Sequence, residues 1–155
     1  GAYNRRFFYQ DIEEYVQTAE ELDGPYAFAM LDIDHFKKIN DTYGHDGGDK
    51  ILKSLAKILT DNTKGRDVVA RFGGEEFCVV LKKIAKEEAI KFFVNLRAKV
   101  AENEVIIKDK IVRVTVSIGI SFGKGHCEID DMLEACDSAL YVAKENGRNR
   151  VEIAL

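Results

Sequence analysis

The residues best suited to chemistry in this chain are two adjacent acids that follow two adjacent glycines. Glu75 and Glu76 come directly after Gly73 and Gly74, between two short apolar runs. Two such runs joined by Gly-Gly predict a tight hairpin in which both glycines take positive φ, and neighbouring strand side chains point to opposite faces. Carboxylates are poor strand formers. The acids therefore indicate either a solvated turn or a site for a phosphate and its metal, which the bare Gly74 would let approach. The two apolar runs are residues 67–70 and 77–81.

A second acidic stretch follows the longest apolar run of the N-terminal half. Residues 26–31 predict a central strand buried on both faces, and Asp32 comes directly after them. A buried acid is costly unless it is paired or bound to a metal, and open α/β sheets bind ligands where their strands end. Mg²⁺ takes carboxylate, carbonyl and phosphate oxygens, so Asp32, a hairpin glutamate and a nucleotide triphosphate could form a two-metal site. The alternative is a helix N-cap, a role that Asp34 fits better.

Three stretches of the sequence together resemble the GGDEF family, the diguanylate cyclases. Arg-Phe-Gly-Gly-Glu-Glu-Phe, residues 71–77, resembles the family signature in its GGEEF form. Residues 32–49 resemble the family's first-strand motif and residues 141–151 its C-terminal motif, in the family's order. The resemblance implies an α/β domain with the palm-like, ferredoxin-related nucleotidyl cyclase fold, in which helices flank a central, mainly antiparallel sheet.

Length and composition agree with one domain over residues 1–155. Hydrophobic residues make up 46% of the chain, and its net charge of −4 gives no global case for nucleic-acid binding. No apolar run reaches membrane-spanning length and no signal peptide is visible, so we expect no direct membrane contact by this domain. The three cysteines lack a metal-binding spacing, and reduced thiols indicate a cytoplasmic domain or the cytoplasmic part of a membrane-attached sensor.

Hydrophobic spacing predicts the elements that must position the acids. Asn4, Arg5 and Arg6 match the end of the family's usual leading motif, but the Leu-Thr that normally precedes them is missing. We therefore expect a fragment of a longer protein with an N-terminal sensory or receiver domain. A short helix should open near His35 and end at a turn around Gly44. Further helices are predicted over residues 8–22, from near 49 to 62, over 89–100 and over 129–143, and further strands over 105–107, 111–122 and 151–153.

By the resemblance, substrate residues follow Asp32 along the chain. The backbone at His35, Phe36 and Lys37 would cradle a triphosphate, because the first N–H groups of a helix suit an anion. The lysine would add its charge or lie in solvent. Asn40 and Asp49 would read guanine, whose N1–H and N2–H₂ donors a carboxylate can accept. The alternative for Asp49 is the first turn of a helix, where acids are favoured.

The resemblance also assigns basic residues and an inhibitory site. Lys144 and Arg148 would contact the terminal phosphates, although cations near a helix C-terminus are favourable in any case. Many family members carry an Arg-x-x-Asp site that binds the cyclic product. This chain keeps Asp67 but has Lys64 where the arginine is expected, and lysine lacks the bidentate fork of arginine. The inhibitory site is therefore degenerate, and we expect weak product inhibition.

The implied activity is that of a diguanylate cyclase, which condenses two GTP molecules into cyclic di-GMP and pyrophosphate between the two subunits of a transient homodimer. Two Mg²⁺ ions per half-site, or Mn²⁺, would be held by Asp32, the Ile33 carbonyl and Glu75. Asp32 and Glu75 would be catalytic, and Glu76 would be either a catalytic helper or structural. The competing interpretation is an inactive GGDEF module that binds GTP or cyclic di-GMP as a regulatory domain.

Overall fold

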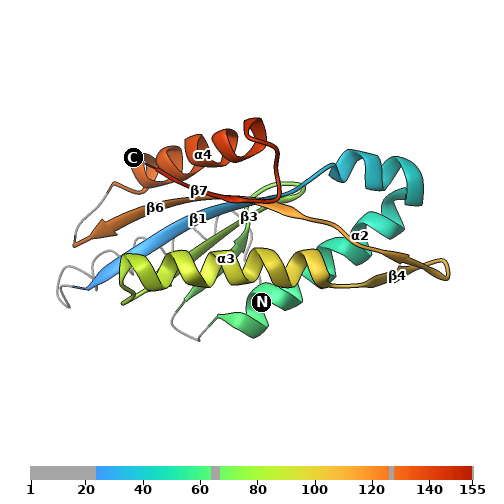
Figure 1. Cartoon of the computed structure of the whole chain (residues 1–155), viewed down its shortest axis with the longest axis horizontal. Coiled ribbons are helices and arrows are strands. Elements are labelled where there is room, and N and C mark those ends of the chain that lie inside the picture. Colours follow the sequence, from blue (N-terminus) through green and yellow to red (C-terminus); the bar gives the residue numbers. More distant parts are fainter. Residues whose placement is uncertain (1–23, 64–66, 126–127, 155) are drawn as a thin grey trace.

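A five-stranded sheet forms the centre of the fold in the computed structural model, which describes residues 24–63, 67–125 and 128–154 (Figure 1). The strand order is β2-β3-β1-β6-β7, and only the β6–β7 pair is parallel. The predicted α/β class with a mainly antiparallel sheet is confirmed. The helix predicted over residues 8–22 lies outside the described residues. The strands are β1 (Pro25–Ile33), β2 (Val68–Arg71), β3 (Glu76–Lys82), β6 (Val116–Lys124) and β7 (Val151–Ile153).

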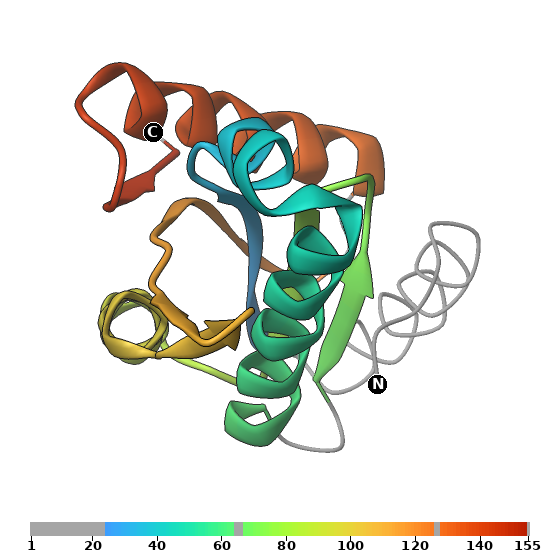
Figure 2. The ribbon, with the colours of Figure 1, turned by 90° about the vertical axis from the view of Figure 1, so that its right-hand side faces the viewer.

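Helices cover both faces of this sheet, which explains the continuous apolar run of β1 (Figures 1 and 2). Alternate side chains of a strand point to opposite faces. The odd-numbered residues 27–33 join the larger core with α2 and α3, while Tyr26, Phe28 and Met30 join a smaller core with α4. Asp32 belongs by this alternation to the α4 face. The helices are α2 (Phe36–Asn62), α3 (Lys86–Glu102) and α4 (Ile129–Glu145).

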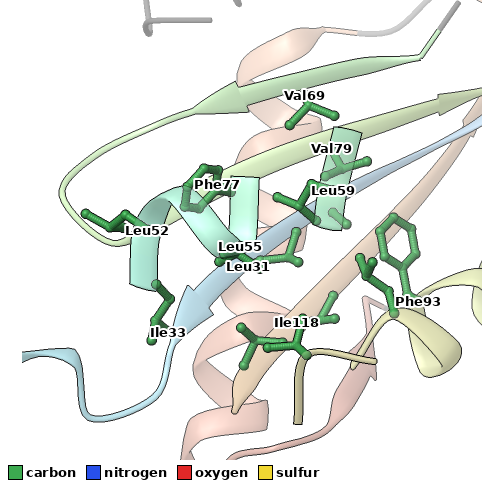
Figure 3. Packing of buried hydrophobic residues seen from close by; sticks show 14 of the residues in the cluster. Leu31, Ile33, Leu52, Leu55, Leu59, Val69, Phe77, Val79, Phe93 and Ile118 are labelled. Carbon is green, nitrogen blue, oxygen red and sulfur yellow. The ribbon is translucent and has the colours of Figure 1, made fainter. Parts of the chain in front are cut away.

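The larger core lies where α2 and α3 meet the sheet (Figure 3). Leu52, Leu55 and Leu59 recur at helical spacing on α2 and pack over β1 and β3, and Phe93 of α3 packs in the same cluster. Cys78 and Cys136 are free thiols buried in the smaller core. Within the described residues, no helix is both long and apolar enough to cross a membrane.

The single strand predicted over residues 111–122 is wrong. The structure divides it into β5 (Lys110–Val112), which pairs with β4 (Val105–Ile107) in a separate hairpin, and β6 in the main sheet. Val112 pairs with Val105 of β4, whereas Val116 pairs with Ile33 of β1. Both valines are buried. The apolar alternation therefore runs through the break without marking where the chain changes its partner strand.

The hairpin between β2 and β3 is present, but its turn is not the predicted one. Neither Gly73 nor Gly74 takes a positive φ. The loop is instead closed by the Arg71 guanidinium, whose Nε and Nη2 donate to the Gly74 carbonyl at 3.1 and 2.7 Å. The Phe72 amide also donates to the Glu76 carbonyl at 2.8 Å. A four-residue loop over 72–75 replaces the tight two-glycine turn, and Glu76 becomes the first residue of β3.

A kink at Gly44 divides α2, as the sequence predicted. Gly44 has φ 74° and ψ 176° inside an otherwise helical segment, a conformation that glycine adopts without strain. A Cβ built on Gly47 would lie 2.5 Å from the Tyr43 Cβ, so the tight path after the kink requires a glycine there too.

Candidate active site

Asp32 is the centre of the candidate site, at the end of β1. Its side chain is almost fully buried, with 5% relative exposure for the residue. Lys144, from the last turn of α4, donates from Nζ to Asp32 Oδ2. Asp32 Oδ1 is also buried and has no hydrogen-bond partner among the described residues. A buried carboxylate oxygen without a donor is unfavourable, so the orphaned oxygen fits a bound cation.

The hairpin brings a second acid directly opposite. Glu76 pairs with Asp32 in the β1–β3 register, and paired residues on neighbouring strands project to the same face. Glu75 precedes the strand, and its carbonyl accepts from the Ile33 amide at 3.4 Å. The Ile33 side chain lies in the core, so this residue offers only its backbone to the site.

Two carboxyl groups of the site, Asp32 and Glu76, have raised pKa values, and burial is the largest cause for both. Burial raises the pKa of Asp32; the hydrogen bond and charge of Lys144 oppose this, and the charges of Glu75 and Asp34 add to the rise. Burial also raises the pKa of Glu76, and the charges of Asp32, Asp137 and Glu75 add to it against the opposing effect of Lys144. No three His, Cys, Asp or Glu side chains of the described ranges gather into a metal cage. A hard cation would therefore need oxygens from a substrate phosphate as well, as Mg²⁺ commonly does.

The start of α2 lies two residues beyond the end of β1. His35 occupies the N-cap position in the left-handed conformation, with φ 57°, and makes no side-chain cap. The first helical N–H groups, at Phe36, Lys37 and the residue after them, lack partners within the helix and suit an anion. The expected N-cap role of Asp34 is wrong, because this carboxylate turns away to accept hydrogen bonds from Thr115, Ser117 and the Asn149 amide.

The kinked helix brings Asn40 next to Gly48, the residue before Asp49, and the sequence predicts that Asn40 and Asp49 read guanine. Asn40, before the kink, lies against Gly48, where a built Cβ would be only 1.9 Å from Asn40 Oδ1. Asp49 follows Gly48 and is exposed. The importance of Gly47 and Gly48 was missed from the sequence, although a Gly-Gly pair inside a helical segment is itself a signal of close approach. A cavity of about 430 Å³ borders Asp49 between α2 and the β4–β5 hairpin.

The remaining predicted residues belong either to the expected substrate contacts or to the expected inhibitory site. Lys144 contacts Asp32, and Arg148 follows α4 on an exposed turn with φ 65°. Gly74 is open, since a built Cβ would meet nothing within 4 Å. At the expected inhibitory site, Asp67 Oδ1 accepts from the Lys82 amide at 3.1 Å, and Lys64 lies outside the described residues.

Known proteins are similar to this chain in sequence and in architecture. A family model described as diguanylate cyclase, GGDEF domain, matches residues 1–150. Diguanylate cyclase A of Treponema denticola is 38% identical over 154 residues, covering 97% of this chain and 42% of that protein. Diguanylate cyclase DosC of Escherichia coli K12 is 34% identical over 151 residues, covering 97% of this chain and 33% of that protein. The chain thus spans less than half the length of either relative.

Two solved structures are similar over nearly their whole length. The GGDEF domain of DgcB from Caulobacter crescentus, in complex with c-di-GMP, has a TM-score of 0.93 at 31% identity, covering 99% of this chain and 91% of that one. The active GGEEF domain of a diguanylate cyclase from Vibrio cholerae has a TM-score of 0.90 at 35% identity, covering 100% of this chain and 99% of that one. By its family match and its fold, the chain belongs to the GGDEF family of diguanylate cyclase domains.

Proposed function

We propose that this domain is a diguanylate cyclase that condenses two GTP molecules into cyclic di-GMP and pyrophosphate. The observation that carries the proposal is the buried Asp32, with one oxygen unpartnered, opposite Glu76 and beside the start of α2. A carboxylate pair next to open helix N–H groups suits a phosphate together with its counter-cation. The similarity to diguanylate cyclases supports the same activity.

The residues present fit a Mg²⁺ or Mn²⁺ site. Asp32 and the Ile33 carbonyl would hold the ions, together with an acid of the hairpin. Family resemblance implies Glu75, but the strand register favours Glu76, which shares the face of Asp32 and leaves Glu75 to assist at the ribose 3′-hydroxyl. The bound ions would supply stabilisation of the charge that develops on the phosphate oxygens. Lys144, which now donates to Asp32, would contact the terminal phosphates when Asp32 holds an ion.

The nucleotide would lie along α2. Its triphosphate would approach the N–H groups at the start of the helix and the open backbone at Gly74, with Lys37 and Arg148 adding charge. Guanine would lie between Asn40 and Asp49. The Asp49 carboxylate would accept from the N1–H and N2–H₂ donors of the base, and the Asn40 amide can both donate and accept.

Each domain would hold one GTP, so the reaction needs two copies facing each other. The 3′-hydroxyl oxygen of one GTP would attack the α-phosphorus of the other and pass its proton to Glu75 or to water. The bond from the α-phosphorus to the leaving pyrophosphate would break. A second, identical event closes the ring. Positioning supplies most of the catalysis in such phosphoryl chemistry.

Incubation of the domain with GTP and Mg²⁺, followed by chromatographic detection of cyclic di-GMP, tests the proposal. Asp32→Asn should reduce product formation by roughly 100-fold or more, because the site loses the charge that holds the ions. Asp61→Asn is the matched control, since Asp61 is an exposed acid paired with Lys57 on α2. Tight GTP binding without any product would favour the regulatory module instead.

Product inhibition is expected to be weak. Lys64 occupies the position at which family members have an arginine that binds the product. The ammonium of a lysine cannot make the bidentate contacts of a guanidinium. Cyclic di-GMP titrated into the turnover assay should therefore inhibit poorly, and Lys64→Arg should strengthen inhibition. Submicromolar inhibition of the unmodified domain would contradict this expectation.

A further inference from the structure

The turn that follows α4 has an unusual backbone for its sequence. Gly147, Arg148 and Asn149 take positive φ angles of 117°, 65° and 47° in succession. Glycine adopts this region freely and asparagine tolerates it, but for arginine it is unfavourable. The three residues join the end of α4 to the start of β7 (Figure 1). Such a turn persists only when contacts outside it hold it in place.

Those contacts come from both ends of the turn. The Arg148 amide donates to the Ala143 carbonyl at 2.9 Å, which ties it to α4. The Asn149 amide donates to Asp34 Oδ2 at 3.0 Å, and Arg97 Nη1 of α3 donates to Asn149 Oδ1 at 2.7 Å. The backbone on each side of Arg148 is therefore fixed, while its side chain remains exposed.

Asp34 is itself held rigidly. It has a relative exposure of 6%, and its carboxylate accepts from Thr115 Oγ1 at 2.7 Å and Ser117 Oγ at 2.6 Å. Its own amide donates to the Thr115 carbonyl at 2.9 Å. A buried carboxylate with three donors aimed at it is well stabilised and directional. Because Thr115 directly precedes β6 and Ser117 lies at its start, the acid connects the turn to the main sheet.

We propose that Asp34, Asn149 and Arg97 act together as positioning residues that aim the Arg148 guanidinium at the terminal phosphates of GTP. This inference rests on the proposed function and deepens it. Asp34 acts through the Asn149 amide, and Arg97 acts through the Asn149 side chain. Asp34 and Arg97 do not themselves touch the substrate in this proposal. Arg97 extends the site to α3, outside the three family-like stretches of the sequence.

The contribution of these positioning residues to nucleotide affinity should depend on the terminal phosphates and not on the base. A loosened turn lets Arg148 sample more conformations, so a ligand must order it on binding and loses affinity. GMP lacks the terminal phosphates, so its affinity should not depend on how Arg148 is positioned. The loss should appear in the KM for GTP more than in kcat, because the contact is made to the bound substrate as well as to the transition state.

Arg97→Leu tests the proposal without altering the buried acid. Calorimetric titration with Mg²⁺ present should show roughly three- to tenfold weaker GTP binding, the range expected for loss of one charge-assisted hydrogen bond acting indirectly. GMP affinity should be unchanged. Lys99→Leu is the matched control, because Lys99 is an exposed cation on the same helix whose bond goes to Asn62 of α2. Arg97→Lys should recover part of the loss, because it keeps a donor for the Asn149 side chain.

A double-variant cycle adds a second test. Asn149→Gly keeps the backbone conformation and the bond to Asp34 but removes the acceptor for Arg97. It should weaken GTP binding as Arg97→Leu does, and the double variant should be no weaker than either single one. If the ratio of GTP to GMP affinity in Arg97→Leu equals that in Lys99→Leu, the positioning role is wrong while the proposed function stands. An unmodified domain that does not bind GTP at all would overturn both.

Discussion

Two carboxyl groups of the candidate site, Asp32 and Glu76, are ionised less readily in the folded protein than in the unfolded chain. Burial is the largest cause for both, and it raises both pKa values. Between the ordinary pKa and the raised one, the folded state holds more protons than the unfolded state. Folding stability therefore falls as pH rises through that window. The site is destabilising at neutral pH, as functional sites often are.

Glu76→Gln should remove part of this penalty. The unmodified protein should lose stability relative to the variant as pH rises from near 4.5, the ordinary pKa of this residue, toward neutrality. At neutral pH the variant should be at least as stable as the unmodified protein while making little cyclic di-GMP. Urea unfolding of both proteins at several pH values measures this. A stability difference that moves in favour of the unmodified protein on raising the pH would show that Glu76 is stabilised as an anion.

Gly74→Ala should affect the approach of the substrate and leave folding stability nearly unchanged. A Cβ there meets nothing within 4 Å and the backbone φ is not positive, so the free energy of unfolding should change by less than about 0.5 kcal/mol. GTP turnover should nevertheless fall several-fold, because the methyl group would occupy the approach of the triphosphate. Kinetics equal to those of the unmodified domain would remove Gly74 from the substrate contacts.

The sequence predicted the position of Asp32 in the fold better than it predicted the residues around Asp32. An acid after a run buried on both faces had to lie at a strand end near the core. Which hairpin acid faces it depends on the strand register, and the residue pattern alone left that open. The partners of Asp34 lie more than 80 residues away in the chain, at Thr115, Ser117 and Asn149, so local signals indicated only a helix cap.

Among the elements, α4 matters most for the site because it carries Lys144 and ends at the Arg148 turn. It lies unusually close to β6 at Gly119. A Cβ on Gly119 would be 2.2 Å from both the Cys136 carbonyl oxygen and the Leu140 amide nitrogen. These are backbone atoms of α4, so they cannot move without the helix.

Gly119→Ala should push α4 away from the sheet. Overpacking of this kind typically costs about 1–3 kcal/mol, and backbone contacts place this position toward the upper end. The variant should unfold at lower urea concentration, and the Lys144 contact with Asp32 should weaken. Ser121→Ala, which removes the hydroxyl that donates to the Met132 carbonyl and adds no volume, is the milder comparison on the same strand. Unchanged stability of Gly119→Ala would mean that α4 can shift at no cost.

Element types were largely predictable, whereas partners and turn geometry were not. The helical spacing of α3 and α4 and the Gly44 break in α2 follow from local pattern and glycine chemistry. The break between β5 and β6 was invisible because Val112 and Val116 are both buried, on different sheets. The loop at Gly73 and Gly74 depends on Arg71 binding a carbonyl three residues ahead, a contact that Gly-Gly statistics do not contain.

For the whole molecule, we expect that one domain binds only one of the two GTP molecules that the reaction joins. In the proposed function, Asp32, the start of α2 and the Arg148 turn would bind one nucleotide, and the proposed chemistry joins two nucleotides. With a net charge of −4, two copies repel weakly at low salt, so their encounter should limit the rate at low concentration. A parallel coiled coil fused ahead of Tyr3 would raise the effective concentration to the millimolar range for a short linker.

The most direct test is the initial rate of cyclic di-GMP formation per domain, measured with saturating GTP and Mg²⁺ across a dilution series. Sedimentation is recorded at the same concentrations, with and without the coiled-coil fusion. We predict that specific activity rises with concentration for the domain alone, and that the fusion is more active at every dilution. Specific activity that stays flat down to concentrations where only monomer sediments would contradict catalysis by two facing domains, and no cyclic di-GMP at any concentration would contradict the proposed activity.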